Sequence, residues 1–279
     1  MAAIASTATL PRRPFALSAA SPLATLVRRR FQLVARTPRE LIVPLLTPIL
    51  FALVIAPALK DALHTGTAYE SYVAIGTVGL LIPLNTMFSG LSAIVDRESG
   101  AQRELLAAPV PRSLLVIANL LVAMAVTALQ VVTLIGFALL RGIDFHTSGA
   151  GLLWFLGAAL LFTVGMYGMA EILASRVPRQ EEYIARVPAI AILPWFLAGA
   201  LFPISVLPNV MTWIAKFLPL THGLALMRYG LLGDSSGLHH VWGGGSAAGL
   251  AALSLLVVAA FAALLTVVSI RVFTRTAVR

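Results

Sequence analysis

Long stretches without a single charged residue dominate this sequence of 279 residues and restrict what it can fold into. Several of them reach the roughly 20 apolar residues that a helix needs to cross the hydrocarbon core of a bilayer. A buried helix of a soluble protein is usually shorter and carries a polar face. The sequence therefore predicts an all-α, polytopic membrane protein with six transmembrane helices, at residues 41–59, 72–95, 113–140, 150–172, 184–203 and 243–270.

The composition excludes several classes of chemistry. Only 11% of the residues are charged, whereas soluble domains are about one quarter charged. The absence of cysteine excludes disulfides, thiolate metal sites and cysteine nucleophiles. The chain contains neither a Gly-Lys dipeptide, which a phosphate-binding loop requires, nor a zinc-binding H-E-x-x-H motif. We therefore expect a protein that is not an enzyme and that binds no metal or cofactor itself.

The positions of the basic residues predict an orientation in the membrane. With six spans, the N-terminal segment, residues 96–112, residues 171–186 and the C-terminal tail share one side, which holds 16 of the 20 basic residues. The other side holds only Lys60, Arg141, Lys216 and Arg228. Basic loops favour the cytoplasm, so we expect both termini there. The net charge of +9 thus reflects membrane orientation, and we expect no nucleic-acid partner.

The segments outside the regular spans have distinct characters. Residues 1–21 are rich in Ala, Ser, Thr and Pro and are expected to be disordered, and residues 276–279 form a cytoplasmic tail. Residues 22–37 predict an amphipathic helix in the interface plane, with Arg30 as the one basic residue on its apolar face, near Phe31. Prolines after the fifth span predict short, broken, re-entrant helices on the outer side, before the sixth span.

Strongly polar residues are scarce within the predicted spans. Asn85, Gln130 and Glu171 are the candidates for contact with a transported substrate. The alternative is that Asn85 and Gln130 form hydrogen bonds between helices, and that Glu171 pairs with Arg176 or meets water. Coupling to a proton or sodium gradient usually requires a charged group at mid-membrane, which this sequence supports poorly.

The most informative segment is the cytoplasmic loop at residues 96–112, with the sequence DRESGAQRELLAAPVPR. Its first half is densely charged and its second half is apolar, up to Pro109 and Pro111. This pattern predicts a short amphipathic helix. A solvated connector would not need the apolar half, whereas a helix that docks onto a cytoplasmic partner would use both.

This loop resembles the hallmark loop of ABC-2-type transporter permeases, through its acid, Glu, Gly, Glu-Leu-Leu, Ala-Pro and Arg pattern. The multidrug and antibiotic-resistance branch and the nodulation-factor exporter branch are the most similar. A second similarity follows the fifth span, and the basic helix at 22–37 resembles the connecting, or elbow, helix of the family. The resemblance covers about residues 22–275, which would form one transmembrane domain. The residues that carry the second similarity are Leu201-Phe202-Pro203-Ile204, Leu207-Pro208, Leu218-Pro219-Leu220-Thr221-His222 and Arg228.

The resemblance implies half of a transport pathway in the inner (cytoplasmic) membrane, surrounded by lipid. A second permease, identical or related, would complete the pathway. Two copies of an ABC ATP-binding subunit would bind ATP and magnesium and drive transport. The resemblance also implies three sets of site residues: Glu98, Gly100, Arg103, Glu104, Pro109 and Arg112 in the ATPase-coupling loop; Arg28, Arg29, Arg30 and Phe31 in the elbow helix; and Phe202, Pro203, Pro208 and Pro219 in the outer gate.

The scarcity of polar groups in the spans favours an amphipathic or lipophilic substrate, such as a drug, an antibiotic or a lipid-like molecule. Export of a lipid-linked polysaccharide or oligosaccharide by the same architecture is the alternative. An ion-coupled secondary transporter would need a mid-membrane acid and paired inverted repeats with broken helices, which are not evident. A membrane scaffold without transport activity is a third class, and a neighbouring gene for an ATP-binding subunit would argue against it.

Overall fold

A computed structural model describes residues 20–36, 46, 49–55, 57, 58, 61, 67–108, 110–143 and 145–276. This part of the chain is helical and contains no β-strand. The helices are α1 (Ala20–Arg36), the π-helical turn η1 (Phe51–Ile55), α4 (Thr67–Ser89), α5 (Leu91–Glu98), α6 (Ala101–Ala107), α7 (Arg112–Leu140), α8 (Gly149–Arg176), α9 (Gln180–Leu197), the 3₁₀ turn η2 (Ile204–Val206), α10 (Asn209–Phe217), α11 (Pro219–Leu232), α12 (Ser236–Trp242) and α13 (Ala247–Thr276).

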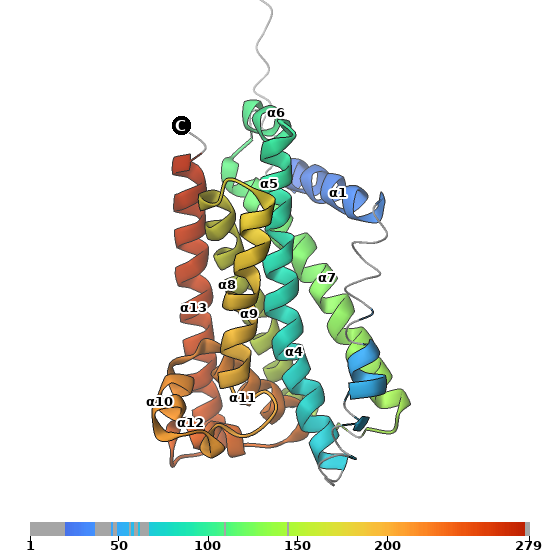
Figure 1. The fold of residues 1–279 in the computed structure, drawn as a ribbon, viewed down its shortest axis with the longest axis vertical. Coiled ribbons are helices and arrows are strands. Elements are labelled where there is room, and N and C mark those ends of the chain that lie inside the picture. Colours follow the sequence, from blue (N-terminus) through green and yellow to red (C-terminus); the bar gives the residue numbers. More distant parts are fainter. Residues whose placement is uncertain are drawn as a thin grey trace, which may run out of the picture.

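Long helices run side by side and form a bundle (Figure 1). Within the described residues, four helical stretches are long and apolar enough to cross a membrane: Tyr69–Glu98, α7, α8 and Ala247–Arg275. The bent pair α10–α11 makes a fifth if it is one span. Helix α9 also runs along the bundle, but its 18 residues include Glu181, Glu182 and Arg186. The described part of the chain thus holds four or five segments that could cross a membrane, and the count of six stays a prediction.

The predicted spans agree with these helices to different degrees. The spans at 113–140 and 150–172 lie within α7 and α8. The fifth, at 184–203, is wrong at its end, because α9 stops at Leu197 and a turn follows. The sixth was expected to start at 243, but a turn with Gly243 and Gly245 at positive φ delays α13 to Ala247. Residues 41–45, 47, 48, 56 and 59 of the first predicted span, residues 1–19 of the tail, residues 277–279 and Pro109 lie outside the described residues.

The predicted second span, 72–95, is divided at Gly90 into α4 and α5. The hydroxyl of Tyr183 in α9 donates a hydrogen bond to the carbonyl oxygen of Met87. A Cβ atom at Gly90 would overlap that hydroxyl and crowd Ala170 of α8. Glycine thus lets the tyrosine reach the helix backbone, and a residue inserted against a helix in this way is a recognised cause of a kink.

Helices α8 and α13 form the most extensive helix pair of the bundle. Gly165 and Gly168 of α8 lie directly against Phe261, Ala262 and Leu265 of α13. Small residues let two helix backbones approach closely, which is the main source of packing energy between helices in a membrane. These glycines therefore account for the close approach of α8 and α13.

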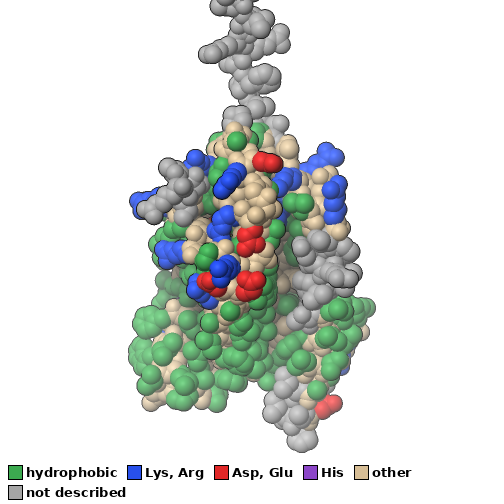
Figure 2. Space-filling view, turned by 45° about the horizontal axis from the view of Figure 1, so that its top comes forward, with side chains coloured by type: hydrophobic (Ala, Val, Ile, Leu, Met, Phe, Trp, Pro, Cys, Tyr) green, Lys and Arg blue, Asp and Glu red, His purple; other side chains and the backbone are tan. Residues whose placement is uncertain are grey.

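The two ends of the bundle differ in character. Helices α1, α5 and α6 and the C-terminal end of α13 lie at one end, whereas α10, α11 and α12 lie together at the other (Figure 1). Arg, Lys, Asp and Glu side chains gather around the first end, and hydrophobic side chains cover the body of the bundle (Figure 2). We call these the basic end and the opposite end.

Candidate functional site

Helix α6 is an exposed element at the basic end. It begins after Gly100, whose φ of 81° is a left-handed conformation that suits glycine. None of its residues is buried, and Arg103 and Glu104 are exposed. Gln102 and Leu105 instead face a pocket below the helix. The expected short amphipathic helix is thus present, with a charged outer face and a second face that packs inward.

Arg97 anchors the segment that leads into α6. Its guanidinium donates hydrogen bonds to the carbonyl oxygens of Ala174 at 3.0 Å and Val177 at 2.6 Å. These carbonyls lie at the C-terminal end of α8, where the last turn of a helix lacks internal donors. Gln180, the first residue of α9, donates to the carboxylate of Glu98 at 2.5 Å. Movement of α6 would therefore act directly on the junction between α8 and α9.

The coupling-loop residues expected from the sequence differ in whether their side chains are free to contact a partner or are bonded within the protein. Arg112 donates to the carbonyl oxygen of Thr274 at 3.4 Å, which ties the start of α7 to the end of α13. Glu98 is engaged with Gln180. The exposed side chains of Arg103 and Glu104 are the ones that project from α6 itself.

Helix α1 corresponds to the expected helix at 22–37 and packs mainly against α7. Arg28 on it is exposed, as expected, and Arg29 forms an ion pair with Asp96 of α5 at 3.6 Å. Phe31, expected on the apolar face of this helix, is 42% exposed. Arg30 is partly buried.

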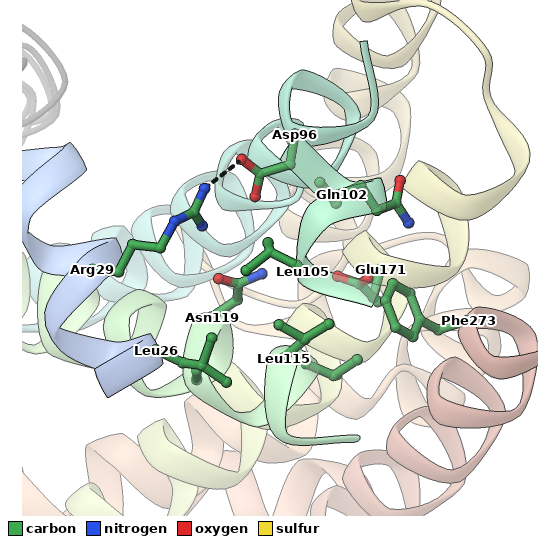
Figure 3. A pocket seen from close by; sticks show the side chains of 12 residues that line it. Leu26, Arg29, Asp96, Gln102, Leu105, Leu115, Asn119, Glu171 and Phe273 are labelled. Carbon is green, nitrogen blue, oxygen red and sulfur yellow. Dashed lines mark ion pairs between the residues drawn. The ribbon is translucent and has the colours of Figure 1, made fainter. Parts of the chain in front are cut away.

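A pocket lies where these elements meet. Figure 3 shows Arg29, Asp96, Asn119 and Glu171 among apolar side chains around it. Glu171 is only 2% exposed and accepts a hydrogen bond of 3.1 Å from the Tyr167 hydroxyl. The pocket residues come from six helices, α1, α5, α6, α7, α8 and α13: Leu26, Arg29, Ala93, Asp96, Gln102, Leu105, Leu115, Val116, Ala118, Asn119, Glu171 and Phe273.

The three candidates for substrate contact lie in different surroundings. Gln130 is fully buried, and neither atom of its side-chain amide has a hydrogen-bond partner in the described part of the chain. The amide nitrogen of Asn85 is in the same situation. Neither residue lines the pocket that Glu171 faces. Glu171 therefore belongs to the basic end, with Tyr167 rather than Arg176 as its hydrogen-bonding partner.

At the opposite end, each expected proline begins a short helical element. Pro203 precedes η2, Pro208 precedes α10, and Pro219 is the first residue of α11. Proline suits these positions because the first turn of a helix does not use the amide hydrogen that proline lacks. Helices α10 and α11 meet at 80°, and Phe202 beside them is 39% exposed. The predicted broken segment is thus present.

Arg228 of α11 is a residue whose position the sequence did not indicate. Counted above among loop charges, it is only 4% exposed. Its guanidinium donates to the carbonyl oxygens of Ala200 at 2.9 Å and Tyr72 at 3.4 Å, and it lies 3.4 Å from the centre of the Tyr72 ring. It joins α11, α4 and the turn after α9. An arginine within an otherwise apolar helix was the available signal.

Comparison with known proteins agrees with this arrangement. The family model described as ABC-2 type transporter matches residues 22–232. The chain belongs to the ABC-2-type transporter family. Transport permeases of this family are multi-pass membrane proteins, consistent with the apolar helices of the bundle.

Individual relatives are more distant. The chain is 27% identical over 190 residues to transport permease ycf38 of Porphyra purpurea, covering 68% of this chain and 65% of that protein. The ycf38 protein of Pyropia yezoensis matches to the same extent. Nodulation protein J of Rhizobium meliloti (strain 1021) is 28% identical over 89 residues, which is 32% of this chain and 34% of that protein. The chain thus spans slightly less than two thirds of the length of its two longer matches.

Proposed function

We propose that this ABC-2-type protein is the membrane-spanning permease subunit of an ATP-binding cassette exporter. It would move an amphipathic or lipophilic substrate, such as a drug, an antibiotic or a lipid-like molecule, out across the cytoplasmic membrane. The observation that carries the proposal is α6, an exposed helix at the basic end whose preceding residues are bonded to the ends of α8 and α9. A partner that displaced α6 would also move the bundle.

In this proposal a separate subunit hydrolyses ATP. Two copies of that subunit would bind ATP and magnesium, and two permeases, identical or related, would form the pathway between them. The absence of a phosphate-binding loop from the sequence supports this division. Arg103 and Glu104 would contact the ATP-binding subunit, because they project from α6 into solvent.

The proposed orientation places the basic end in the cytoplasm and gives the protein six spans in the inner membrane. The gathering of basic residues at one end supports it, because cytoplasmic segments are enriched in Lys and Arg. Helix α1 would then be the elbow helix at the inner surface. Helices α10 and α11 would form a re-entrant segment on the outer side, with Phe202, Pro203, Pro208 and Pro219 at the exit gate.

A second class of substrate is a lipid-linked polysaccharide or oligosaccharide. The similarity to nodulation protein J over 89 residues supports this alternative. ATP-dependent uptake into inverted vesicles that contain the permease and its ATP-binding subunit would separate the two. The panel would hold a lipophilic dye, a fluorescent phospholipid and a polyprenol-linked oligosaccharide.

Glu104→Lys tests the coupling role of α6. We expect the variant to insert and fold normally, because Glu104 is exposed, but to lose substrate-stimulated ATP hydrolysis by the complex. Glu181→Lys is the matched control, since it reverses an exposed charge at the same end in α9. Full stimulated activity of Glu104→Lys would contradict the docking role. Rapid ATP turnover by the pure permease alone would contradict the division between subunits.

A further inference from the structure

Two polar side chains in the middle of α7 are buried without hydrogen-bond partners. Gln130 is fully buried, and neither the nitrogen nor the oxygen of its amide is bonded within the described residues. Thr127, one turn earlier on the same side of the helix, is 3% exposed, and its hydroxyl is also without a partner there. Such groups are costly, because they have lost hydrogen bonds to water and gained none in return. Packing alone therefore does not explain them.

Asn85 of the neighbouring helix α4 lies at about the same depth in the bundle. Helices α4 and α7 run antiparallel, and Glu70 near the start of α4 forms an ion pair of 3.8 Å with Arg141 directly after α7. Asn85 follows Glu70 by 15 residues (70 to 85), and Thr127 precedes Arg141 by 14 (127 to 141). With a rise of 1.5 Å per residue, the two lie within about 2 Å of one level.

A second pair of neighbours gives the same alignment from the basic end. Ala93 of α5 and Ala118 of α7 line one pocket. Asn85 precedes Ala93 by 8 residues (85 to 93), and Thr127 follows Ala118 by 9 (118 to 127). The amide nitrogen of Asn85 is also buried without a partner in the described residues. Asn85 thus lies level with the polar pair of α7, to within about one helical turn.

The contact between α4 and α7 at this level consists of packing. Helix α4 is bonded to α9, since the side chains of Trp195 and Tyr183 donate to the carbonyl oxygens of Gly76 and Met87. Near the level of Asn85, the described residues form no hydrogen bond between α4 and α7. A separation of these two helices there would break no hydrogen bond. It would expose the three polar side chains to whatever enters between the helices.

The surroundings indicate what could enter. Gln130 offers two donors and one acceptor, and Thr127 offers a hydroxyl that can do both. Residues 71–95 and 113–140 contain no Asp, Glu, Lys or Arg, so nothing on these helices would balance the charge of an ion. Leu129 beside Gln130 is 47% exposed, and Phe88 of α4 is 44% exposed. An apolar surface that faces outward from the bundle therefore adjoins the polar side chains, and a molecule dissolved in the bilayer could reach them sideways.

We propose that Asn85, Thr127 and Gln130 form a membrane-embedded site for the neutral polar group of a lipophilic substrate, such as a carbonyl, amide or hydroxyl group. The inference rests on the proposed function and narrows its substrate class to uncharged molecules. In the present conformation the site is closed. When α4 and α7 separate around the substrate, the three side chains gain hydrogen bonds without losing any, which favours the bound state.

The experiment measures ligand binding and stability of the full-length permease in lipid nanodiscs, for Gln130→Leu and Thr127→Val. The control is Thr133→Val, which removes a hydroxyl of the same helix that already donates to the carbonyl oxygen of Leu129 at 2.8 Å. Three fluorescent probes share one dye and one carbon chain: a dodecanamide, a dodecylammonium and a dodecane. Empty nanodiscs give the partition of each probe into lipid, and thermal unfolding gives the midpoint of each variant.

We expect Gln130→Leu to bind the dodecanamide probe about fivefold to tenfold more weakly than the parent, the equivalent of about one hydrogen bond. Its midpoint should equal that of the parent or exceed it by about 2 °C or more, because leucine removes unsatisfied groups. Thr127→Val should change both quantities in the same directions. Thr133→Val should bind the probe as the parent does. An amide with a purely structural role would show the reverse, a lower midpoint with unchanged affinity.

The inference is overturned if the parent does not bind the dodecanamide probe more tightly than the dodecane and dodecylammonium probes, or if Gln130→Leu keeps the parent affinity. If Gln130→Leu does not fold, Thr127→Val carries the same test, and unchanged affinity in that variant refutes the site. Binding is measured without the ATP-binding subunit. Failure of the proposed function is therefore distinguishable, since it would appear as a lack of ATP-dependent uptake by the parent complex.

Discussion

Gly168→Ala in α8 is expected to destabilise the bundle, although alanine favours helices more than glycine does. A Cβ atom at Gly168 would lie 2.8 Å from the carbonyl carbon and 2.9 Å from the carbonyl oxygen of Leu265 in α13. These are backbone atoms, which cannot rotate away as a side chain can. The same substitution at Gly157, on the same helix, would place Cβ 3.8 Å from the end of the Leu255 side chain, an ordinary contact.

The magnitude follows from the distance that the helices must move. Restoring the 2.8 Å contact to 3.4 Å, the lower limit of ordinary contact, separates α8 from α13 locally by about 0.6 Å. A gap of this size forfeits roughly a quarter or more of the dispersion energy of each affected contact. Overpacked substitutions typically cost about 1–3 kcal/mol, net of repacking. Gly157→Ala avoids this cost and gains up to about 1 kcal/mol in helix propensity.

Thermal unfolding of the two variants in detergent, followed by fluorescence-detected size-exclusion chromatography, measures the difference. For a chain of this size, each kcal/mol changes the midpoint by about 2–4 °C. We expect Gly168→Ala to unfold at least about 2 °C below the parent protein, and Gly157→Ala at or above it. Equal midpoints for the two variants would refute the view that close backbone approach at Gly168 holds α8 against α13.

Two further substitutions test contacts at the opposite end. Ser148→Ala removes the side chain that accepts a hydrogen bond of 3.0 Å from the amide of Gly151 at the start of α8, and should cost about 0.5–2 kcal/mol in the same unfolding assay. Arg228→Lys keeps the charge but cannot both stack on Tyr72 and reach two carbonyl oxygens. It should lower the midpoint by the equivalent of about 1.5–3 kcal/mol and reduce export, and a parent-like midpoint would contradict the role of the stacked guanidinium.

A helix could be predicted from the sequence where its own residues determine whether it forms. The existence of α8 follows from its run of residues without charge up to Ala170, and its start follows from Ser148, a strong N-terminal cap. The order of the short helices near Pro203, Pro208 and Pro219 follows from the positional preference of proline. These signals are local, so they can be recognised in the sequence without knowledge of tertiary contacts.

The features that could not be predicted depend on residues far apart in the chain. The break at Gly90 requires Tyr183, whose hydroxyl reaches the helix from α9. The burial of Arg228 requires the ring of Tyr72 and the carbonyl oxygens of Tyr72 and Ala200. In each case the local rule was broken because a distant group compensates for it, and such exceptions mark the sites where function is sought.

Helices α4 and α9 are joined at two points, and this constrains how the protein can move. The indole N–H of Trp195 donates to the carbonyl oxygen of Gly76 at 2.7 Å, and the hydroxyl of Tyr183 donates to Met87. The two points are about 17 Å apart along antiparallel helices, given a rise of 1.5 Å per residue. A pair fixed at both points resists sliding and tilting.

Helix α4 continues through α5 to the exposed α6, whereas α9 leads at the opposite end to α10 and α11. We therefore expect a displacement of α6 to be transmitted through the α4–α9 pair to the bent α10–α11 segment. The displacement would reach Arg228 of α11, because Arg228 binds the backbone of both Tyr72 in α4 and Ala200 after α9. One rigid pair of helices thus links the proposed ATPase contact to the proposed exit gate.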